Sequence, residues 1–215
     1  MCTNYRPGSR DYLRNQLGVA ADFDYVAETY PAYRAPIVTR AAQGRRCLSA
    51  GFGLIPPWAR DAKIARSTYN ARSETVAAKP SFRHAWGAAQ FCLVPMQCFY
   101  EPSYASGRAL RWRIEAADGE PFCAAGIWEC WRDPHGAELF TFSLLTINAD
   151  GHALMGAFHA PDDEKRSIVL LAPQDHEAWL QADPQRAPQL LRPFAAADFV
   201  AAPDPRPVAA KSAPR

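Results

Sequence analysis

Residues 121–147 read PFCAAGIWECWRDPHGAELFTFSLLTI, and this stretch decides the kind of fold. It holds two apolar runs, at 121–131 and 139–147, in which aromatic and branched residues are frequent. Such residues pack well on a pleated, half-buried or buried surface. The two runs are therefore predicted to be buried strands at the centre of the protein.

Weaker patterns on both sides of this stretch predict more strands and a few scattered helices. Strands are expected at 35–40, 47–55, 91–100, 110–114 and 167–171. Helices are expected at 10–18, 74–79, 150–158 and 174–181. Strands and helices do not alternate regularly, as they would in a doubly wound parallel sheet. The prediction is a mixed α+β fold around antiparallel sheet.

The composition and the two ends of the chain predict the domain organisation. The 215 residues are 48% hydrophobic and 12% aromatic, which is typical of a folded globular protein. We expect one compact domain over residues 1–200, and a flexible tail over the Pro/Ala-rich residues 201–215. No apolar run is long enough to span a membrane, and no signal peptide is apparent, so the expected location is cytoplasmic.

Six cysteines raise the question of a metal site or disulfides. The sequence contains no C-x-x-C pair, and its five histidines show no H-x-x-x-H pattern. These are the spacings that zinc sites commonly use. We therefore expect no metal and no cofactor, and we interpret the interior cysteines as reduced, small core side chains.

A basic segment stands out against a net charge of only +2. Residues 29–86 contain ten Lys and Arg side chains against two acids, a local charge of +8. Trp58, Tyr69, Phe82 and Trp86 are interleaved with these cations. Single-stranded nucleic acid offers phosphates to cations and unstacked bases to aromatic faces, so the segment suits such a partner. A solvated basic face with aromatic residues in the core is the alternative interpretation.

Cys2 becomes chemically special if Met1 is removed. Trimming, which normally occurs before a small residue, would leave an α-amine and a thiol on adjacent carbons. This 1,2-aminothiol condenses with an aldehyde: the amine forms an imine, and sulfur then closes a five-membered thiazolidine. An α-amine with a pKa near 7.7–8.0 is roughly a tenth to a fifth unprotonated at pH 7, several hundred times more than lysine. Taken alone, Cys2 is better interpreted as a residue with no role.

Several short motifs change that balance. The central block runs from Thr68-Tyr69-Asn70-Ala71-Arg72-Ser73-Glu74-Thr75 through Lys79-Pro80-Ser81-Phe82-Arg83 and Cys92-Leu93-Val94-Pro95 to Cys98-Phe99-Tyr100-Glu101. Together with the Met1-Cys2 start, Gly53-Leu54-Ile55-Pro56, Trp58, Ala125-Gly126-Ile127-Trp128 and His159, this block resembles the SRAP family (SOS response-associated peptidase, also called abasic-site processing proteins). The resemblance covers roughly residues 2–181.

The resemblance implies a fold and a function. It implies a single compact α+β domain with a curved, barrel-like antiparallel sheet, peripheral helices and a basic groove for single-stranded DNA. It further implies covalent capture of abasic sites in the DNA damage response, with possible autopeptidase removal of Met1. The expected partner is single-stranded DNA containing abasic sites, and the protein is expected to be a monomer that joins the nucleoid when bound to damaged DNA.

The resemblance also implies roles for individual residues. Cys2 matches the thiazolidine-forming nucleophile, Asn70 the side chain that holds Cys2 and the sugar, and Glu101 and His159 the acid and the histidine that move protons. The expected DNA contacts are Arg72, Trp58, Arg83 and Thr146. Outside the motif context, Glu101 would be interpreted as a surface acid, His159 as a loop histidine and Asn70 as a turn residue.

The sequence departs from the family pattern at four places. Thr3 replaces a common Gly, Pro102 replaces an aromatic after the motif glutamate, and Phe52 stands where tryptophan is usual. The family's His-x-Arg-Met-Pro becomes His159-Ala160-Pro161-Asp162-Asp163-Glu164-Lys165-Arg166, an apparent insertion after the histidine. In it, Arg166 could resume the role of the motif arginine.

Two other functions remain open at this point. One is an N-terminal-nucleophile cysteine peptidase or amidohydrolase, which would use Cys2 with its own α-amine as the base. The other is a non-covalent single-strand DNA binding module in which Cys2 is irrelevant.

Overall fold

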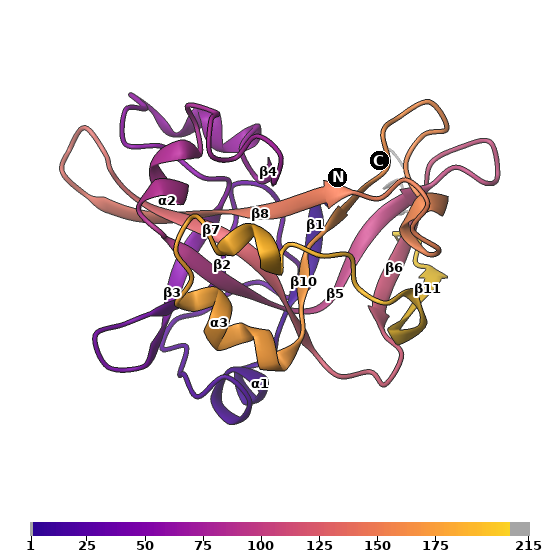
Figure 1. The fold of residues 1–215 in the computed structure, drawn as a ribbon, viewed down its shortest axis with the longest axis horizontal. Helices are drawn as coiled ribbons and strands as arrows, with labels where there is room; N and C mark the ends of the chain where they lie inside the picture. The colour runs from indigo at the N-terminus through magenta and orange to yellow at the C-terminus, as the bar shows by residue number, and fades with distance from the viewer. Residues whose placement is uncertain (1, 207–215) are drawn as a thin grey trace, which may run out of the picture.

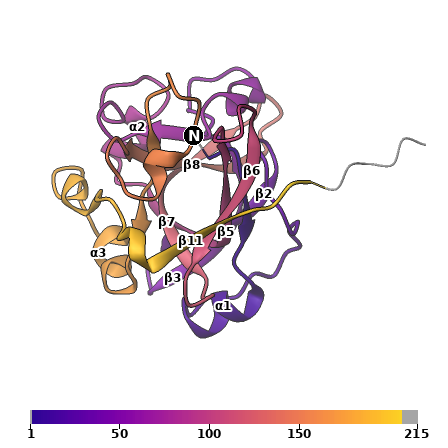
Figure 2. The same ribbon diagram turned by 90° about the vertical axis from the view of Figure 1, so that its right-hand side faces the viewer.

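Five strands close into a small barrel in the computed structural model, which describes residues 2–206. Around the barrel the hydrogen-bonded order is β5–β7–β8–β3–β2 and back to β5, and only the β3–β8 pair is parallel. Figure 2 shows these strands encircling a common centre. The five strands are β2 (Arg34–Arg40), β3 (Arg45–Phe52), β5 (Phe91–Ser103), β7 (Phe122–Arg132) and β8 (Glu138–Asn148).

Shorter strands extend the sheet beyond the barrel. β5 also pairs with β1 and β6, and β6 pairs with β11. β8 also pairs with β4 and β9, and β7 pairs with β10. Their bounds are β1 (Asn4–Pro7), β4 (Asn70–Arg72), β6 (Leu110–Ala116), β9 (Arg166–Ile168), β10 (Leu170–Leu171) and β11 (Phe199–Pro203). The predicted α+β fold around a curved, mainly antiparallel sheet is confirmed.

The helices are short and lie at the periphery (Figure 1). The α-helices are α1 (Arg10–Asn15), α2 (Arg83–Gly87) and α3 (His176–Leu180). Single 3-10 turns are η1 (Ala62–Arg66), η2 (Met155–Ala157), η3 (Pro173–Asp175), η4 (Ala187–Leu190) and η5 (Ala196–Asp198). In residues 2–206 no helix has the length and apolar character that crossing a membrane would need.

Two predicted helices do not form as expected. Residues 74–79 make turns instead of a helix, and the nearby helix α2 begins only at Arg83. The side chain of Glu74 leaves this segment to pair with Arg166 from β9, a partner 92 residues away. Residues 150–158 contribute only the turn η2. In both places tertiary contacts override weak local propensity.

The core has two parts on opposite faces of the barrel wall. One part lies beneath the helices and includes Leu13 of α1, Trp86 of α2 and Trp179 of α3. The other part fills the barrel interior, and Cys2 belongs to it. Alternation along β5 supplies both parts, because Leu93 faces the helices and Val94 the interior.

Two glycines in the motif stretches are required by the fold. Gly53 has φ 124°, and a Cβ there would lie 2.1 Å from the carbonyl oxygen of Ala65. A Cβ at Gly126 would lie 2.8 Å from Cys92 Sγ inside the barrel wall. Any larger residue at either position would therefore force the backbone or its neighbours to move.

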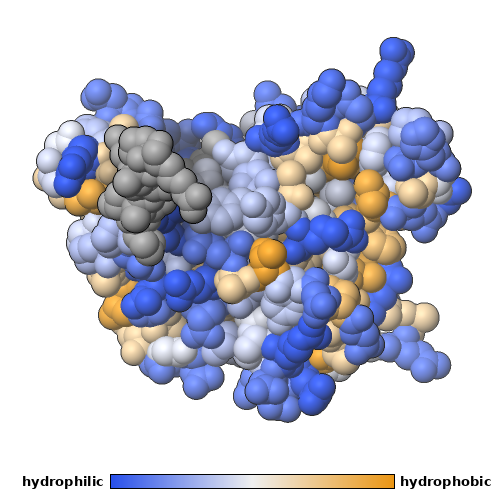
Figure 3. Space-filling model, turned by 180° about the vertical axis from the view of Figure 1, so that it is seen from behind, coloured by the Kyte–Doolittle hydropathy of each residue, from blue (hydrophilic) through white to orange (hydrophobic). Residues whose placement is uncertain are grey.

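The C-terminal end corrects one predicted boundary. Residues 201–203, expected to open a flexible tail, belong to β11 and pair with Ile114, Arg113 and Trp112 of β6. Residues 207–215, the rest of the predicted tail, lie outside the described residues. The surface seen in Figure 3 is mainly hydrophilic, with apolar residues in small separate patches.

Candidate functional site

Cys2 is completely buried at the edge of the sheet. It precedes β1, which pairs antiparallel with β5 so that Asn4 faces Tyr100. Continuing this register brings Cys2 beside the Glu101 end of β5. The Cys2 thiol donates to the carbonyl oxygen of Asn4 at 3.5 Å. Burial, followed by the Glu101 carboxylate, raises the pKa of the Cys2 thiol well above its usual value, so the sulfur is protonated at neutral pH.

Asn70 reaches Cys2 from a different strand. It is the first residue of β4, which lies parallel to β8 with Asn70 opposite Leu144. Its side-chain Nδ2 donates to the Cys2 carbonyl oxygen at 2.8 Å. The Oδ1 atom of the same amide is buried and accepts no hydrogen bond from the described residues. Asn70 therefore fixes the start of the chain and keeps one acceptor available.

Glu101 and His159 form a buried acid–imidazole pair. His159 Nε2 lies 3.0 Å from Glu101 Oε2, and the two residues are only 7% and 2% exposed. The backbone N–H of His159 donates to the carbonyl oxygen of Pro102 at 2.9 Å. His159 also has φ 66°, a left-handed conformation that costs free energy for a residue other than glycine. The loop thus holds the imidazole against the carboxylate at an energetic cost.

This arrangement can transfer protons next to a sulfur nucleophile. A carboxylate and an imidazole within ion-pairing distance can pass a proton between them and to a bound reactant. A cavity of about 350 Å³ reaches Glu101 from the surface and is lined by Thr3, Asn4, Tyr100, Glu101, Pro102, Ala109, Arg111 and Arg206. The structure therefore brings Cys2, Asn70, Glu101 and His159 into one site, as the motifs predict.

A second polar network supports the first residues of the chain, and sequence reasoning missed it. Glu28 Oε1 accepts hydrogen bonds from Asn4 Nδ2 and from Arg111 Nη2, both at 2.5 Å, and another from the Tyr30 hydroxyl. Burial alone would raise the pKa of Glu28, but the hydrogen bonds from Tyr30 and Arg111 outweigh it and lower that pKa. Arg111 is 83 residues from Glu28 in sequence, so no local signal could have revealed the pair.

Arg72 and Thr146 differ sharply in exposure. Arg72, at the end of β4, has a half-exposed side chain that pairs with Glu164 at 2.8 Å. Thr146 on β8 is fully buried. Its Oγ1 accepts from Arg166 at 3.1 Å and lies 3.5 Å from the carbonyl oxygen of Ala71. Thr146 therefore contacts β4 from the interior of the protein and does not reach the surface.

Trp58 and Arg83 are exposed and do not belong to the buried cluster of Cys2, Asn70, Glu101 and His159. Trp58 is 57% exposed, and its Nε1 donates to the carbonyl oxygen of Pro80 at 3.1 Å. Arg83 begins α2 and is exposed. We call these two residues the rim. No hydrogen bond or ion pair joins the rim to Cys2, Glu101 or His159 among residues 2–206.

The basic segment divides into two parts. Its second half contributes exposed cations on the segment that contains β4 and α2, namely Arg60, Lys63, Arg66, Arg72, Lys79 and Arg83. Arginines of its first half belong to β2 and β3, and there Arg45 pairs with Glu177 of α3 at 2.9 Å. The local charge of +8 is therefore divided between two sets of elements.

The cysteines form no disulfides. All six cysteines are free, and Cys92, Cys98 and Cys123 are buried. Within the part of the chain that the structure describes, no three His, Cys, Asp or Glu side chains are grouped so that they could hold a metal ion.

The fold and the site together define a class of protein: a small closed barrel whose wall buries a cysteine from the start of the chain. The chain belongs to the family described as SOS response associated peptidase (SRAP), whose sequence profile matches residues 1–210.

Curated relatives are named as abasic site processing proteins, and solved structures share the fold. The chain is 34% identical to the "Abasic site processing protein YoqW" of Bacillus subtilis, over 70% of this chain and 65% of that protein. It is 25% identical to the rat "Abasic site processing protein HMCES", over 46% of this chain and 36% of that protein. A Bordetella bronchiseptica structure matches with a TM-score of 0.89 and 32% identity, covering 94% of this chain and 99% of the other. A Bacteroides thetaiotaomicron structure, 24% identical, shares the fold with a TM-score of 0.80 over 93% and 90% of the two chains.

Proposed function

We propose that this protein processes abasic sites in DNA by capturing them covalently on Cys2 in single strands, after Met1 has been removed. The names of the curated relatives support abasic-site processing. The observation that carries the covalent step is the position of Cys2, held by Asn70 and placed beside the Glu101–His159 pair. Capture would shield the lesion during the DNA damage response.

The proposed reaction balances as a condensation. The α-amine of Cys2 attacks the sugar aldehyde carbon, a carbon–nitrogen double bond forms, and one water leaves. The Cys2 sulfur then adds to the same carbon, and its proton passes to the nitrogen. The product is a thiazolidine ring joined to both the protein and the DNA. No oxidant, reductant or metal is needed.

The protonated sulfur favours this order of steps. Burial and the nearby Glu101 carboxylate keep Cys2 as a thiol. An α-amine with an ordinary pKa is partly unprotonated near neutral pH, so it is the better first nucleophile. A peptidase that attacks through its cysteine would need the thiolate, which this site disfavours. The protonated Cys2 therefore favours covalent capture over a cysteine peptidase.

Glu101, His159 and Asn70 have separate roles in this proposal. An abasic sugar is mostly a closed hemiacetal, so a proton must move between its ring oxygen and its hydroxyl before the aldehyde appears. Glu101 and His159 would move that proton and those of imine formation. Asn70 would donate a hydrogen bond from Nδ2 to the Cys2 carbonyl and accept one from a sugar hydroxyl with its buried Oδ1.

The exposed residues would guide the strand to the site. In this proposal Arg72 and Arg83 contact phosphates and Trp58 stacks on a base. Thr146, which is buried, would act through β4 and Arg166, and not by direct contact. A non-covalent binding module could use the same surface residues, so only the chemistry of Cys2 separates the two proposals.

The test uses three proteins and two oligonucleotides, one with an abasic site and one undamaged. The wild-type protein should give a species that survives denaturing electrophoresis. Cys2→Ala should bind undamaged single strands normally but give no such species, because no sulfur can close the ring. Cys2→Ser keeps the amine, so borohydride should trap its imine, and without borohydride it should dissociate. A stable crosslink from Cys2→Ala without reductant would refute the proposal.

Removal of Met1 can be tested independently. The intact mass of active protein purified from cells should correspond to a chain that starts at Cys2. Trimming by a cellular enzyme and removal by the protein itself both give this mass. Active protein that quantitatively retains Met1 would exclude the aminothiol reaction.

A further inference from the structure

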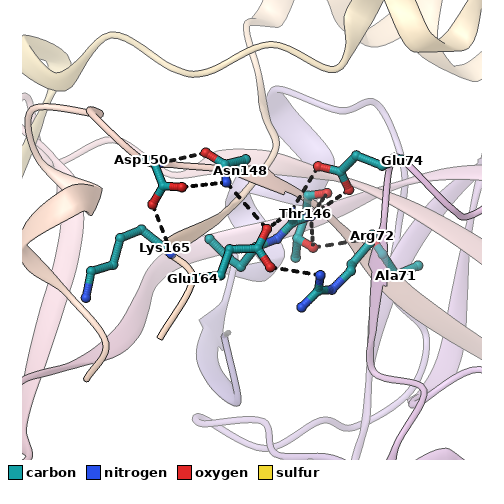
Figure 4. A network of polar contacts seen from close by, with 9 residues as sticks. Ala71, Arg72, Glu74, Thr146, Asn148, Asp150, Glu164 and Lys165 are labelled. Carbon is teal, nitrogen blue, oxygen red and sulfur yellow. Dashed lines mark hydrogen bonds and ion pairs between the residues drawn. The ribbon is translucent and has the colours of Figure 1, made fainter. Parts of the chain in front are cut away.

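Glu164 joins two arginines through the two oxygens of one carboxylate. Its Oε2 lies 2.8 Å from Arg72 Nη1, and its Oε1 lies 2.8 Å from Arg166 Nη1. Figure 4 shows Glu164 reaching across to Arg72 from the segment that also carries Lys165. Glu164 comes from the insertion after His159. A phosphodiester likewise presents two charged acceptor oxygens on one central atom, and arginine pairs with both groups in this way.

Arg166 is fixed in place before any ligand arrives. Its side chain is 3% exposed and makes two 2.9 Å bonds to the two carboxylate oxygens of Glu74. It also donates to the carbonyl oxygen of Thr146 at 2.8 Å. Arg166 therefore keeps its position when the Glu164 side chain moves.

The charges balance only while Glu164 is present. Arg72 and Arg166 contribute two positive charges, and Glu74 and Glu164 contribute two negative charges. Without Glu164 the group carries one positive charge, which one phosphodiester would neutralise. Glu164 and Arg72 are both partly exposed, at 36% and 51%, so a strand can reach the place where they meet.

We propose that the Glu164 carboxylate occupies the position of a DNA phosphate and competes with the strand for Arg72 and Arg166. The inference rests on the proposed function, because it takes single-stranded DNA as the ligand of Arg72. Glu164 then lowers the affinity for undamaged DNA. A covalent bond at Cys2 would still retain an abasic strand. The competition persists at neutral pH, since the hydrogen bond from Arg166 holds the pKa of Glu164 below its usual value.

The insertion supplies a matched control for the test. Asp163 lies in the same loop and carries the same charge, but its side chain makes no hydrogen bond or ion pair with Arg72 or Arg166 within residues 2–206. Glu164→Gln and Asp163→Asn therefore change the net charge equally. Only the first removes a carboxylate from the two guanidinium groups.

Affinity for an undamaged thymidine oligonucleotide should be measured by fluorescence anisotropy at fixed salt. We expect Glu164→Gln to bind about two- to fivefold more tightly, the range of one partly exposed ion pair, because it frees Arg72 while Arg166 keeps its pair with Glu74. Asp163→Asn should change the affinity by less than that. In an Arg72→Ala background the gain from Glu164→Gln should shrink, since the contested arginine is absent.

Two outcomes overturn the inference. If Glu164→Gln binds no more tightly than Asp163→Asn, the carboxylate does not compete with the strand. If Glu164→Gln binds more weakly, Glu164 instead orients Arg72 for binding. Either result leaves the proposed function intact as long as the wild-type protein still crosslinks to an abasic strand. Loss of that crosslink in the wild type is the separate failure of the proposed function.

Discussion

The buried cluster of Cys2, Asn70, Glu101 and His159 and the rim of Trp58 and Arg83 lie in different physical environments. Cys2, Glu101 and His159 are 0%, 2% and 7% exposed, whereas Trp58 of the rim is 57% exposed. Charges in the cluster interact through a medium of low polarity, and the Glu101 carboxylate adds to the effect of burial in raising the pKa of the Cys2 thiol. Groups at the rim are surrounded by water, which screens them from one another. In the proposed function, chemistry would take place in the interior and strand contact at the surface.

The two regions should also respond differently to substitution. Removing one member of the cluster leaves a buried polar partner uncovered, so effects should be large and non-additive. Removing one rim residue uncovers much less, because Trp58 and Arg83 are already exposed to water. Rim effects should be small and should add. The following predictions test this difference, beginning with the largest effect.

Glu101→Gln should slow covalent capture about 10²- to 10⁴-fold, the usual contribution of a positioned acid or base. His159→Ala should do the same, and the double variant should be little slower than either single variant because the two side chains act as a pair. Quenched time courses on an abasic oligonucleotide would measure the rates.

Binding provides the control for this prediction. Both variants should keep their affinity for undamaged single strands, and the mass that the DNA adds to each protein should be the same as for the wild type. Rates that multiply in the double variant would mean that Glu101 and His159 act independently.

Asn70→Ala should slow capture about five- to a hundredfold. It removes the 2.8 Å hydrogen bond to the Cys2 carbonyl and the buried Oδ1 acceptor, and losing a hydrogen bond of this kind costs about 1–3 kcal/mol. Asn15→Ala, at the exposed end of α1, is the matched control and should capture at the wild-type rate. An unchanged rate for Asn70→Ala would separate this residue from the chemistry.

The central strands and the residues of the buried cluster could be predicted from the sequence. The apolar runs predicted β7 and β8 because alternating or continuous apolar strands are local signals. Cys2, Asn70, Glu101 and His159 were predicted as one site through motifs, and the structure brings them together. The resemblance to the SRAP family supplied these positions, and the residue types taken singly would not have grouped them.

Features that depend on distant partners were not predictable. β11 forms because Phe199–Pro203 finds β6, more than 80 residues earlier in the chain, and its composition alone indicated a tail. The Glu28–Arg111 and Glu74–Arg166 pairs also join distant segments. The exposure of Thr146 could not be predicted either, because burial depends on which strands cover β8.

Trp58→Ala should weaken single-strand binding about fivefold. Base stacking on an aromatic side chain contributes about 1–3 kcal/mol, and we expect the lower end because the ring is already half covered and tethered to Pro80. Trp58→Phe keeps a flat face and should recover most of the affinity. Titration with an undamaged oligonucleotide would check this, and equal losses in the two variants would argue against stacking.

Arg83→Ala should have the smallest effect, about a twofold loss of affinity at moderate salt. One phosphate contact changes the slope of log affinity against log salt by about 0.7 for a single strand, so the slope should flatten by that amount. Arg186→Ala is the matched control, since Arg186 is 80% exposed and follows α3 in the sequence, outside the basic segment. It should change neither affinity nor slope beyond the effect of net charge.

The Trp58→Ala and Arg83→Ala losses should also add in free energy, because both side chains are solvated and no described contact links them. Strong coupling between them would show that the rim behaves like the buried cluster, and the distinction between the two regions would fail.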